Sequence, residues 1–201
     1  MIKTKMKGFT LAEVLITLGI IGIVAALTMP QLFNRTRNSH LGAQFASTIS
    51  TLENAIGVYL YDNNVKSLKL LEDGNLTAPA LLDKLDSEKY IKFSPAELKA
   101  TLTNCEPKFA LPDKSVVGIC GSEALVDFVD TVETPNMFFL ASSSVKNENL
   151  IEGLDYFTMY LAADGRIYLP GLDYKTSATC SEEGGEGCSG DIAKNGWKFQ
   201  Y

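Results

Sequence analysis

A single carboxylate, Glu13, stands near the front of an apolar run, and from Phe9 to Phe33 it is the only ionisable side chain. A charge inside a membrane helix costs about 2.5–3.5 kcal/mol on insertion scales, so it is by default functional and needs a partner. Within the chain no Lys or Arg lies one helical turn from Glu13. Cleavage after Gly8 would create an α-amino group on Phe9. That amine can meet Glu13 of a neighbouring, axially shifted copy, and such a pair is worth most where water is excluded.

Four cysteines, all in the second half of the chain, also have chemistry of their own: Cys105, Cys120, Cys180 and Cys188. None belongs to a CxxC pair, and the only histidine, His40, is far away in sequence, which argues against zinc. Two disulfides are expected. Three pairings are open, of which the local one joins Cys105 to Cys120 and Cys180 to Cys188, each bond stabilising by about 2–3 kcal/mol. Because disulfides form in oxidising compartments, this half is expected outside the cytoplasm.

The composition gives little support to an enzyme or a nucleic-acid-binding protein. One histidine completes no catalytic triad, and the chain has no phosphate loop and no HExxH. The 201 residues include 18 basic and 24 acidic side chains, a net formal charge of −6, without a basic stripe interleaved with aromatics. We therefore expect a non-enzymatic protein without a cofactor or a nucleic-acid surface.

The apolar run is long enough to cross a bilayer, which takes about 20 residues. Lys3, Lys5 and Lys7 precede it without any acid, so the positive-inside rule holds them in the cytoplasm and places the remainder outside. An ordinary secretory signal is the alternative, because Val24-Ala25-Ala26 is a possible cleavage site. Cleavage there would discard Glu13 and leave a soluble or anchored periplasmic binding module.

An amphipathic stripe follows the run and favours a continuous helix. Its apolar members recur every three or four residues: Leu41, Phe45, Ile49, Leu52, Ile56 and Tyr59. No Gly or Pro occurs in residues 34–38, so run and stripe can form one helix of about 50 residues, roughly 80 Å long. We expect it to end at Asp62-Asn63-Asn64. Pro30 removes one backbone hydrogen bond, which predicts a kink or a loosened stretch.

One short segment near the amino terminus carries a family resemblance, together with Pro30: Lys7-Gly8-Phe9-Thr10-Leu11-Ala12-Glu13-Val14-Leu15-Ile16. It resembles the prepilin-type cleavage and methylation segment of type IV pilins and type II secretion pseudopilins. The resemblance covers roughly residues 3–35. It combines a short basic leader, Gly before an aromatic residue, Glu four residues after that aromatic, and a long apolar helix.

This resemblance implies that a prepilin peptidase cuts between Gly8 and Phe9 and N-methylates Phe9, which keeps the positive charge. It implies a structural filament subunit, with Glu13 pairing across copies and Pro30 marking a bend. The implied partners are homologous subunits, the peptidase, an inner-membrane assembly platform and the membrane. The implied location is the bacterial inner membrane, as a single-pass protein with a periplasmic head, and then the filament. A pilus, a secretion pseudopilus and a DNA-uptake filament all remain open.

The resulting organisation has four parts: a leader (1–8), a hydrophobic helix (9–33), its amphipathic continuation (34–62) and a head (63–201). Capped helices are expected at Thr77–Leu82 and Ser94–Glu97. Strands are expected at Ala124–Val132, Met137–Ala141, Tyr156–Leu161 and Arg166–Leu169, with a hairpin turn at Asp164-Gly165. The predicted fold is α+β, a long amino-terminal helix packed through its stripe on an antiparallel sheet, as the resemblance also implies.

The carboxyl-terminal residues leave two alternatives open. Between Cys180 and Cys188, carboxylates alternate with glycines and can supply oxygen ligands for calcium, as some pseudopilins do in a carboxy-terminal loop: Glu182, Glu183 and Glu186. Their spacing fits no calcium motif, so a solvated loop is favoured. Trp197, Phe199 and Tyr201 alternate with polar residues, which predicts a half-buried final strand rather than a binding patch.

Overall fold

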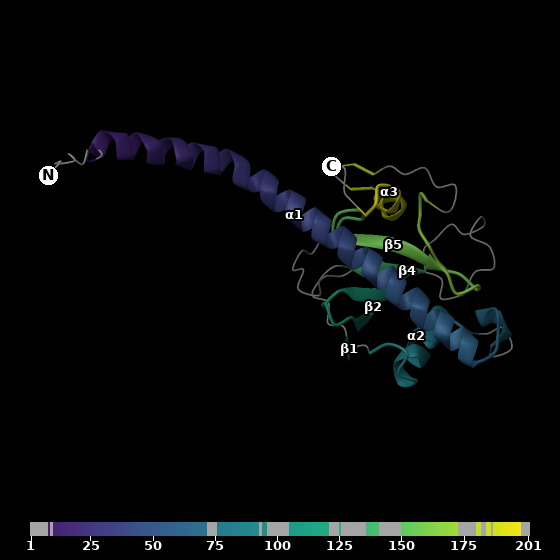
Figure 1. Ribbon diagram of the computed structural model, residues 1–201. Coiled ribbons are helices and arrows are strands. Elements are labelled where there is room, and N and C mark those ends of the chain that lie inside the picture. The colour runs from purple at the N-terminus through teal and green to yellow at the C-terminus, as the bar shows by residue number, and fades with distance from the viewer. Residues whose placement is uncertain are drawn as a thin grey trace. The chain divides into compact units, whose positions relative to one another are not determined.

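The computed structural model divides the chain into two compact units, Met1–Ser39 and His40–Tyr201 (Figure 1). It describes residues 8, 10–71, 76–92, 94–95, 105–120, 125, 136–140, 150–172, 180–181, 184–185 and 187–197, without the side chains of residues 30, 31, 33–38 and 95. One helix, α1 (Leu11–Asp62), begins in the first unit and ends in the second. The boundary between the two units therefore lies within α1.

Helix α1 ends where the sequence predicts. Its last residue is Asp62, and Asn64 follows in the left-handed conformation at φ 53°. The Val65 N–H then donates to the Leu60 carbonyl at 3.0 Å. This pattern closes a helix through a left-handed residue, a conformation that Asn tolerates better than most residues. The Asn63-Asn64 pair is thus a stop signal that the sequence already carries.

The predicted stripe of α1 faces the interior of the head. Five of its six members are buried: Phe45, Ile49, Leu52, Ile56 and Tyr59. Leu41, the first member, is half-buried. Figure 1 shows this part of α1 lying across one face of the sheet. Because a helix with one apolar face must bury it against another element, the stripe fixes which side of α1 meets the sheet.

Helix α2 (Ala78–Ser87) confirms the first of the two predicted short helices. The Thr77 hydroxyl caps it by accepting from the Ala80 N–H at 3.4 Å, and Pro79 lies in its first turn. The second predicted helix is wrong at its start, because Ser94–Pro95 form strand β1. They pair with Ala110 and Phe109 at the edge of the sheet, the position where a strand can accommodate proline. Ala96 and Glu97 lie outside the described residues.

The described strands form one antiparallel sheet in chain order, β1-β2-β3-β4-β5-β6. Strands β4 (Met137–Leu140), β5 (Tyr156–Leu161) and β6 (Ile167–Tyr168) confirm three predicted strands. Gly165 makes the turn between the last two at φ 84°, as the hairpin signal requires. The predicted strand Ala124–Val132 lies outside the described residues except for Leu125. The α+β fold with a helix on an antiparallel sheet is therefore confirmed.

Strands β2 (Cys105–Ala110) and β3 (Val116–Cys120) were not expected from the sequence. Proline in β2 weakens its strand signal, and all five residues of β3 are buried, so β3 shows no alternation of apolar and polar positions. The Ser115 hydroxyl and N–H both bond the Asp113 carboxylate, at 2.6 and 2.9 Å, and thereby fix the turn between the two strands. Pairing with β4 then completes the sheet.

The core of the head is an aromatic cluster between α1 and the sheet. The Phe45 ring lies 4.9 Å from the Phe139 ring and 5.2 Å from the Phe157 ring, both stacked, and all three are at most 1% exposed. Asn136, directly before β4, is a polar residue buried in the head. Its amide donates to the Leu161 carbonyl at 2.9 Å and accepts from the Leu161 N–H at 2.8 Å. It thereby satisfies two backbone groups that burial would otherwise leave unpaired.

A third helix, α3 (Cys188–Lys194), ends just before the segment expected to form a final strand. Trp197 is in a left-handed bend at φ 62°, so the strand prediction is wrong for this residue. Its N–H donates to the Ile192 carbonyl at 2.8 Å, and its ring meets Phe45 edge-on at 5.7 Å. Trp197 thus packs against α1 instead of continuing into a strand. Residues 198–201 lie outside the described part of the chain.

Candidate functional site

Glu13 lies in the first turn of α1 and bonds Thr10, the residue before the helix. The Thr10 N–H and hydroxyl both donate to Glu13 Oε2, at 2.8 and 2.9 Å. In return the Glu13 N–H donates to Thr10 Oγ1 at 3.3 Å. These reciprocal bonds form a capping box, which satisfies amide groups that a helix start leaves unpaired.

The capping box gives Glu13 an uncharged local partner, which sequence reasoning missed when it looked only for a cation. The signal was present, because Thr10-Leu11-Ala12-Glu13 spells the T-x-x-E pattern of a capping box. Both Thr10 donors reach Oε2, so Oε1 accepts from neither of them. Thr10 therefore holds the carboxylate in place through Oε2 at the exposed end of the helix.

The apolar segment behind Glu13 has no packing partner within the described chain. Leu11–Met29 is long and apolar enough to cross a membrane, and none of it is buried. The Thr17 hydroxyl donates to the Glu13 carbonyl at 2.9 Å, and the Thr28 hydroxyl donates to the Val24 carbonyl at 2.9 Å. Both hydroxyls are satisfied inside the helix, as an apolar surrounding requires. The segment thus presents an apolar surface on every side.

The remaining predicted residues of this segment are placed only in part. Gly8 is exposed and precedes the helix, whereas Phe9 lies outside the described residues. The helix continues through Pro30, so the predicted loosening does not interrupt it, although the Pro30 side chain is not described. The roles of Gly8, Phe9 and Pro30 in processing and assembly stay predictions.

The first disulfide joins Cys105 to Cys120, which face each other directly in strands β2 and β3. It closes the hairpin at the end opposite its turn. Val116, Phe138 and Leu140 form a buried cluster with Cys120 on one face of these strands. The bond therefore holds together a hairpin whose sequence has a weak strand pattern.

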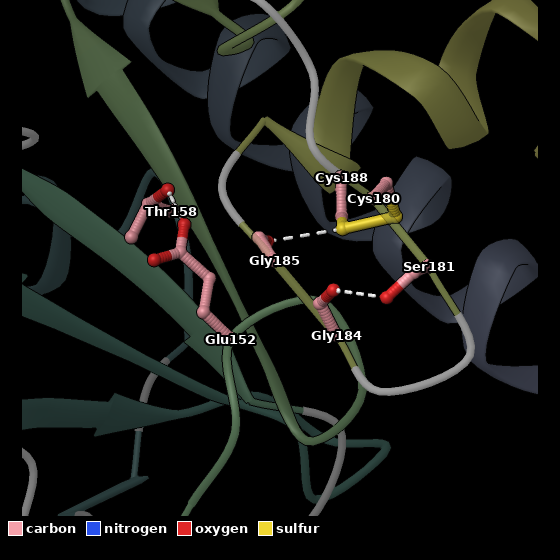
Figure 2. Close-up of a disulfide and its surroundings, with 7 residues drawn as sticks. All are labelled: Glu152, Thr158, Cys180, Ser181, Gly184, Gly185 and Cys188. Carbon is pink, nitrogen blue, oxygen red and sulfur yellow. Dashed lines mark hydrogen bonds between the residues drawn. A yellow bond between two sulfur atoms is a disulfide. The ribbon is translucent and has the colours of Figure 1, made fainter.

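The second disulfide joins Cys180 to Cys188 and holds the carboxy-terminal loop against the segment before β5 (Figure 2). The Gly185 N–H donates to the Glu152 carbonyl at 3.0 Å. A Cβ on Gly153 would lie 2.4 Å from Cys188 Sγ, and Gly153 has φ 86°, so only glycine fits beneath the bond. The Glu152 carboxylate turns away from the loop and accepts the Thr158 hydroxyl bond. The disulfide thus fixes a close contact between the glycine-rich loop and the segment around Gly153.

The calcium question falls on residues that the structure does not describe. Glu182, Glu183 and Glu186 lie outside the described residues. Within the described part, no three His, Cys, Asp or Glu side chains gather in a group that could hold a metal ion. The expectation that this chain works without a cofactor therefore stays a prediction.

Loss of the second disulfide should release the loop from the head. We expect Cys180→Ala with Cys188→Ala to lower the free energy of unfolding by about 2–3 kcal/mol, because the bond closes a loop with a sequence separation of 8. Urea unfolding measures that loss, and hydrogen exchange should show faster exchange of the Gly185 amide. The matched control is Cys105→Ala with Cys120→Ala, which should cost a similar amount yet leave that amide protected. Equal exposure of Gly185 in both variants would contradict a locally held loop.

Comparison with known protein families gives a match in the amino-terminal segment. A family profile described as the prokaryotic N-terminal methylation motif matches residues 3–29. This stretch contains Gly8, Glu13 and most of the exposed apolar helix. No solved structure gives a significant match to the chain.

Two relatives share more than this motif. The type II secretion system core protein G of Escherichia coli (strain K12) is 34% identical over an alignment of 98 residues that covers 46% of this chain and 66% of the relative. The type II secretion system core protein G of Aeromonas hydrophila is 39% identical over 62 residues, which are 31% of this chain and 43% of the relative. The chain thus spans less than two thirds of the length of either relative. Its methylation motif, its helix-on-sheet fold and these two similarities agree in supporting the resemblance to type IV pilins and type II secretion pseudopilins.

Proposed function

We propose that this chain is a structural subunit of a type II secretion pseudopilus or a related type IV pilus-like filament. The observation that carries the proposal is the start of α1, where an exposed apolar helix begins with a carboxylate whose bonds, among the described residues, come from uncharged Thr10. In water, such an exposed apolar surface does not stabilise a single copy of the chain. A membrane covers it before assembly, and other copies cover it afterwards.

Cleavage between Gly8 and Phe9 supplies the missing charge. It frees the Phe9 amine, and N-methylation keeps that amine positive. The capping box holds the Glu13 carboxylate through Oε2, which leaves Oε1 to accept from the amine of an axially shifted neighbour. Because the surrounding side chains are apolar, the pair forms where water is scarce and its attraction is strong.

The relatives' printed names favour a secretion pseudopilus over a pilus. In this role the subunit is inserted in the bacterial inner membrane before assembly, as a single-pass protein with a periplasmic head. Its partners are homologous subunits, the prepilin peptidase and an inner-membrane assembly platform. The role requires no cofactor, no nucleic acid and no catalytic residue of this chain.

The amino terminus of the native protein tests this proposal directly. We expect intact mass measurement and amino-terminal sequencing, on protein made with its own secretion machinery, to find N-methylated Phe9 as the first residue. A terminus near Leu27 would contradict the proposal, because an ordinary signal peptidase would then have removed Glu13 and most of the apolar helix. That result would favour a periplasmic binding module instead.

A further inference from the structure

Helix α3 covers part of the head without joining its sheet. The described sheet runs from β1 to β6 in chain order, and α3 follows it in the sequence. Cys188 and Ile192, which lie one turn apart on α3, are each 1% exposed and belong to the core of the head. A helix of seven residues is too short to be stable by itself in water. Helix α3 therefore depends on being held against the rest of the head.

The turn after α3 contacts α1 through Trp197. The Trp197 ring meets the Phe45 ring edge-on, with 5.7 Å between the ring centroids. A Cβ built on Gly42 would overlap the Trp197 carbonyl oxygen, so the backbone of this turn lies directly on α1 at a residue without a side chain. Phe45 also stacks on Phe139 and Phe157, which belong to β4 and β5. The contact of α1 with the sheet thus has its own support, separate from Trp197.

Two polar contacts position the body of α3 on the turn that follows β6. The Gly190 N–H donates to the Pro170 carbonyl at 2.9 Å, and the Lys194 ammonium donates to the Gly171 carbonyl. Water can replace both partners when α3 leaves the head, so the net contribution of each bond to stability is modest. These bonds therefore orient α3 but hold it only weakly.

The Cys180–Cys188 disulfide is a covalent tie that reaches the first residue of α3 (Figure 2). Between the two cysteines, Gly184, Gly185 and Gly187 have φ values of 91°, 144° and 75°. Glycine loses more conformational freedom on folding than any other residue, so ordering this loop costs entropy. The disulfide lowers that cost because it keeps the ends of the loop together. Without the bond, docking of α3 has to order the loop as well.

The two sulfurs of this bond differ in their access to solvent. Cys180 is half-buried, whereas Cys188 is 1% exposed and lies against the backbone of Gly153. A thiolate from outside therefore attacks Sγ of Cys180, and Cys188 leaves as a thiolate. Apolar surroundings disfavour a charged thiolate, so Cys188 leaves more readily when α3 has moved off the head. Breaking the disulfide and undocking α3 thus favour each other.

We propose that the Cys180–Cys188 bond, α3 and Trp197 form a redox-responsive device, here called the carboxy-terminal latch. When the disulfide is intact, the latch is closed and Trp197 lies on α1. When the disulfide is reduced, α3 and Trp197 leave the head, while the sheet and its contact with α1 remain. This inference concerns the head alone and does not depend on the filament role.

Opening the latch takes a dithiol as the reductant. One of its thiolates attacks Sγ of Cys180, the S–S bond breaks, and the Cys188 thiolate takes up a proton. The second thiolate of the dithiol then attacks the mixed disulfide and releases Cys180, which is protonated in turn. The dithiol becomes a cyclic disulfide, so its two-electron oxidation balances the reduction of the protein. Closing is the reverse reaction, with a disulfide as the oxidant.

The latch makes completion of the head depend on the compartment in which the head resides. In reducing surroundings the carboxy-terminal segment stays open, and in an oxidising compartment it closes. The first disulfide does not work in this way. Cys105 and Cys120 face each other within the β2–β3 ladder, whose backbone bonds persist when the sulfurs separate.

Titration of the full chain in detergent with dithiothreitol tests the latch. Trp197 is the only tryptophan of the chain, so its fluorescence reports docking directly. Alkylation and mass spectrometry measure the reduction of Cys180–Cys188, in a chain where Cys105→Ala and Cys120→Ala isolate this bond. We expect one midpoint for its reduction and for a red shift of the Trp197 emission, with the β4 amides still protected from hydrogen exchange. Unchanged emission after reduction would overturn the latch, and so would simultaneous loss of β4 protection.

A pair of glycine substitutions tests the same coupling from the other side, because coupling between two events is reciprocal. Gly42→Ala adds a Cβ where the Trp197 carbonyl oxygen lies, and alanine itself favours the helix. We expect a red-shifted Trp197 emission and a dithiothreitol midpoint for Cys180–Cys188 that is lower by about tenfold. Gly57→Ala is the matched control in α1, because its Cβ would meet no heavy atom within 4 Å, and it should change neither. Equal midpoints for the two variants would contradict the coupling.

Discussion

Glu13→Ala should leave the subunit cleaved and inserted in the membrane but absent from filaments. The substitution removes the only carboxylate of the apolar segment, so the Phe9 amine of a neighbouring copy would be buried without a counter-charge. Removing one member of a buried ion pair costs about 3–5 kcal/mol, which corresponds to a loss of incorporation of about a hundredfold or more. Quantifying processed protein in membranes and in sheared filaments measures both halves of this prediction.

The capping box supplies the control that distinguishes charge from helix capping. Glu13→Gln removes the charge but keeps a side chain that can complete a capping box. We expect it to fail in assembly nearly as severely as Glu13→Ala. Thr10→Ser, which keeps a hydroxyl for the Glu13 carboxylate, should assemble normally. Normal filaments from Glu13→Gln would show that Glu13 acts as a cap and not as a counter-ion.

Phe45→Ala should destabilise the head more than any substitution on the exposed side of α1. The Phe45 side chain is 0% exposed and contacts two stacked rings from β4 and β5 and the edge of Trp197. Replacing a buried Phe by Ala costs about 3–5 kcal/mol, a large part of the stability of a typical domain. Urea unfolding of the processed chain in detergent, followed by tryptophan fluorescence, should report this loss.

Val58→Ala is the matched control on the same helix. Val58 is 50% exposed, so its truncation should change the free energy of unfolding by less than about 0.5 kcal/mol. If both substitutions cost the same, α1 does not pack on the sheet through its predicted stripe. Since the two positions differ in exposure but share one helix, any effect on helix formation alone would appear in both.

Local signals in the sequence were sufficient for the elements that depend on nearby residues. Thr77 caps α2, Asn64 ends α1 and Gly165 turns the last hairpin, in each case through bonds within a few residues. The stripe of α1 was also readable, because burial of one helix face imposes a regular spacing. Strands β4, β5 and β6 were found because short runs rich in aromatic and other apolar residues are typical of strands.

Long-range packing decided the elements that the sequence did not reveal. Strand β3 is buried along its whole length, so its pattern does not alternate, and only pairing with β2 and β4 defines it as a strand. Ser94–Pro95 carry helix-start signals but pair at the sheet edge, where backbone bonds to β2 outweigh local preference. The Trp197 ring packs edge-on against Phe45, a residue far away in the sequence.

The sequence by itself determined the family resemblance, the apolar helix and the lone acidic residue within it, because each of these is a property of composition and spacing over a short segment. Tertiary structure decided what surrounds those residues. It showed Thr10 holding Glu13 through one oxygen, and it left Gly57 and Tyr61 exposed on the side of α1 away from the sheet. Burial depends on residues far apart in the chain, and spacing along one helix cannot specify which face remains uncovered.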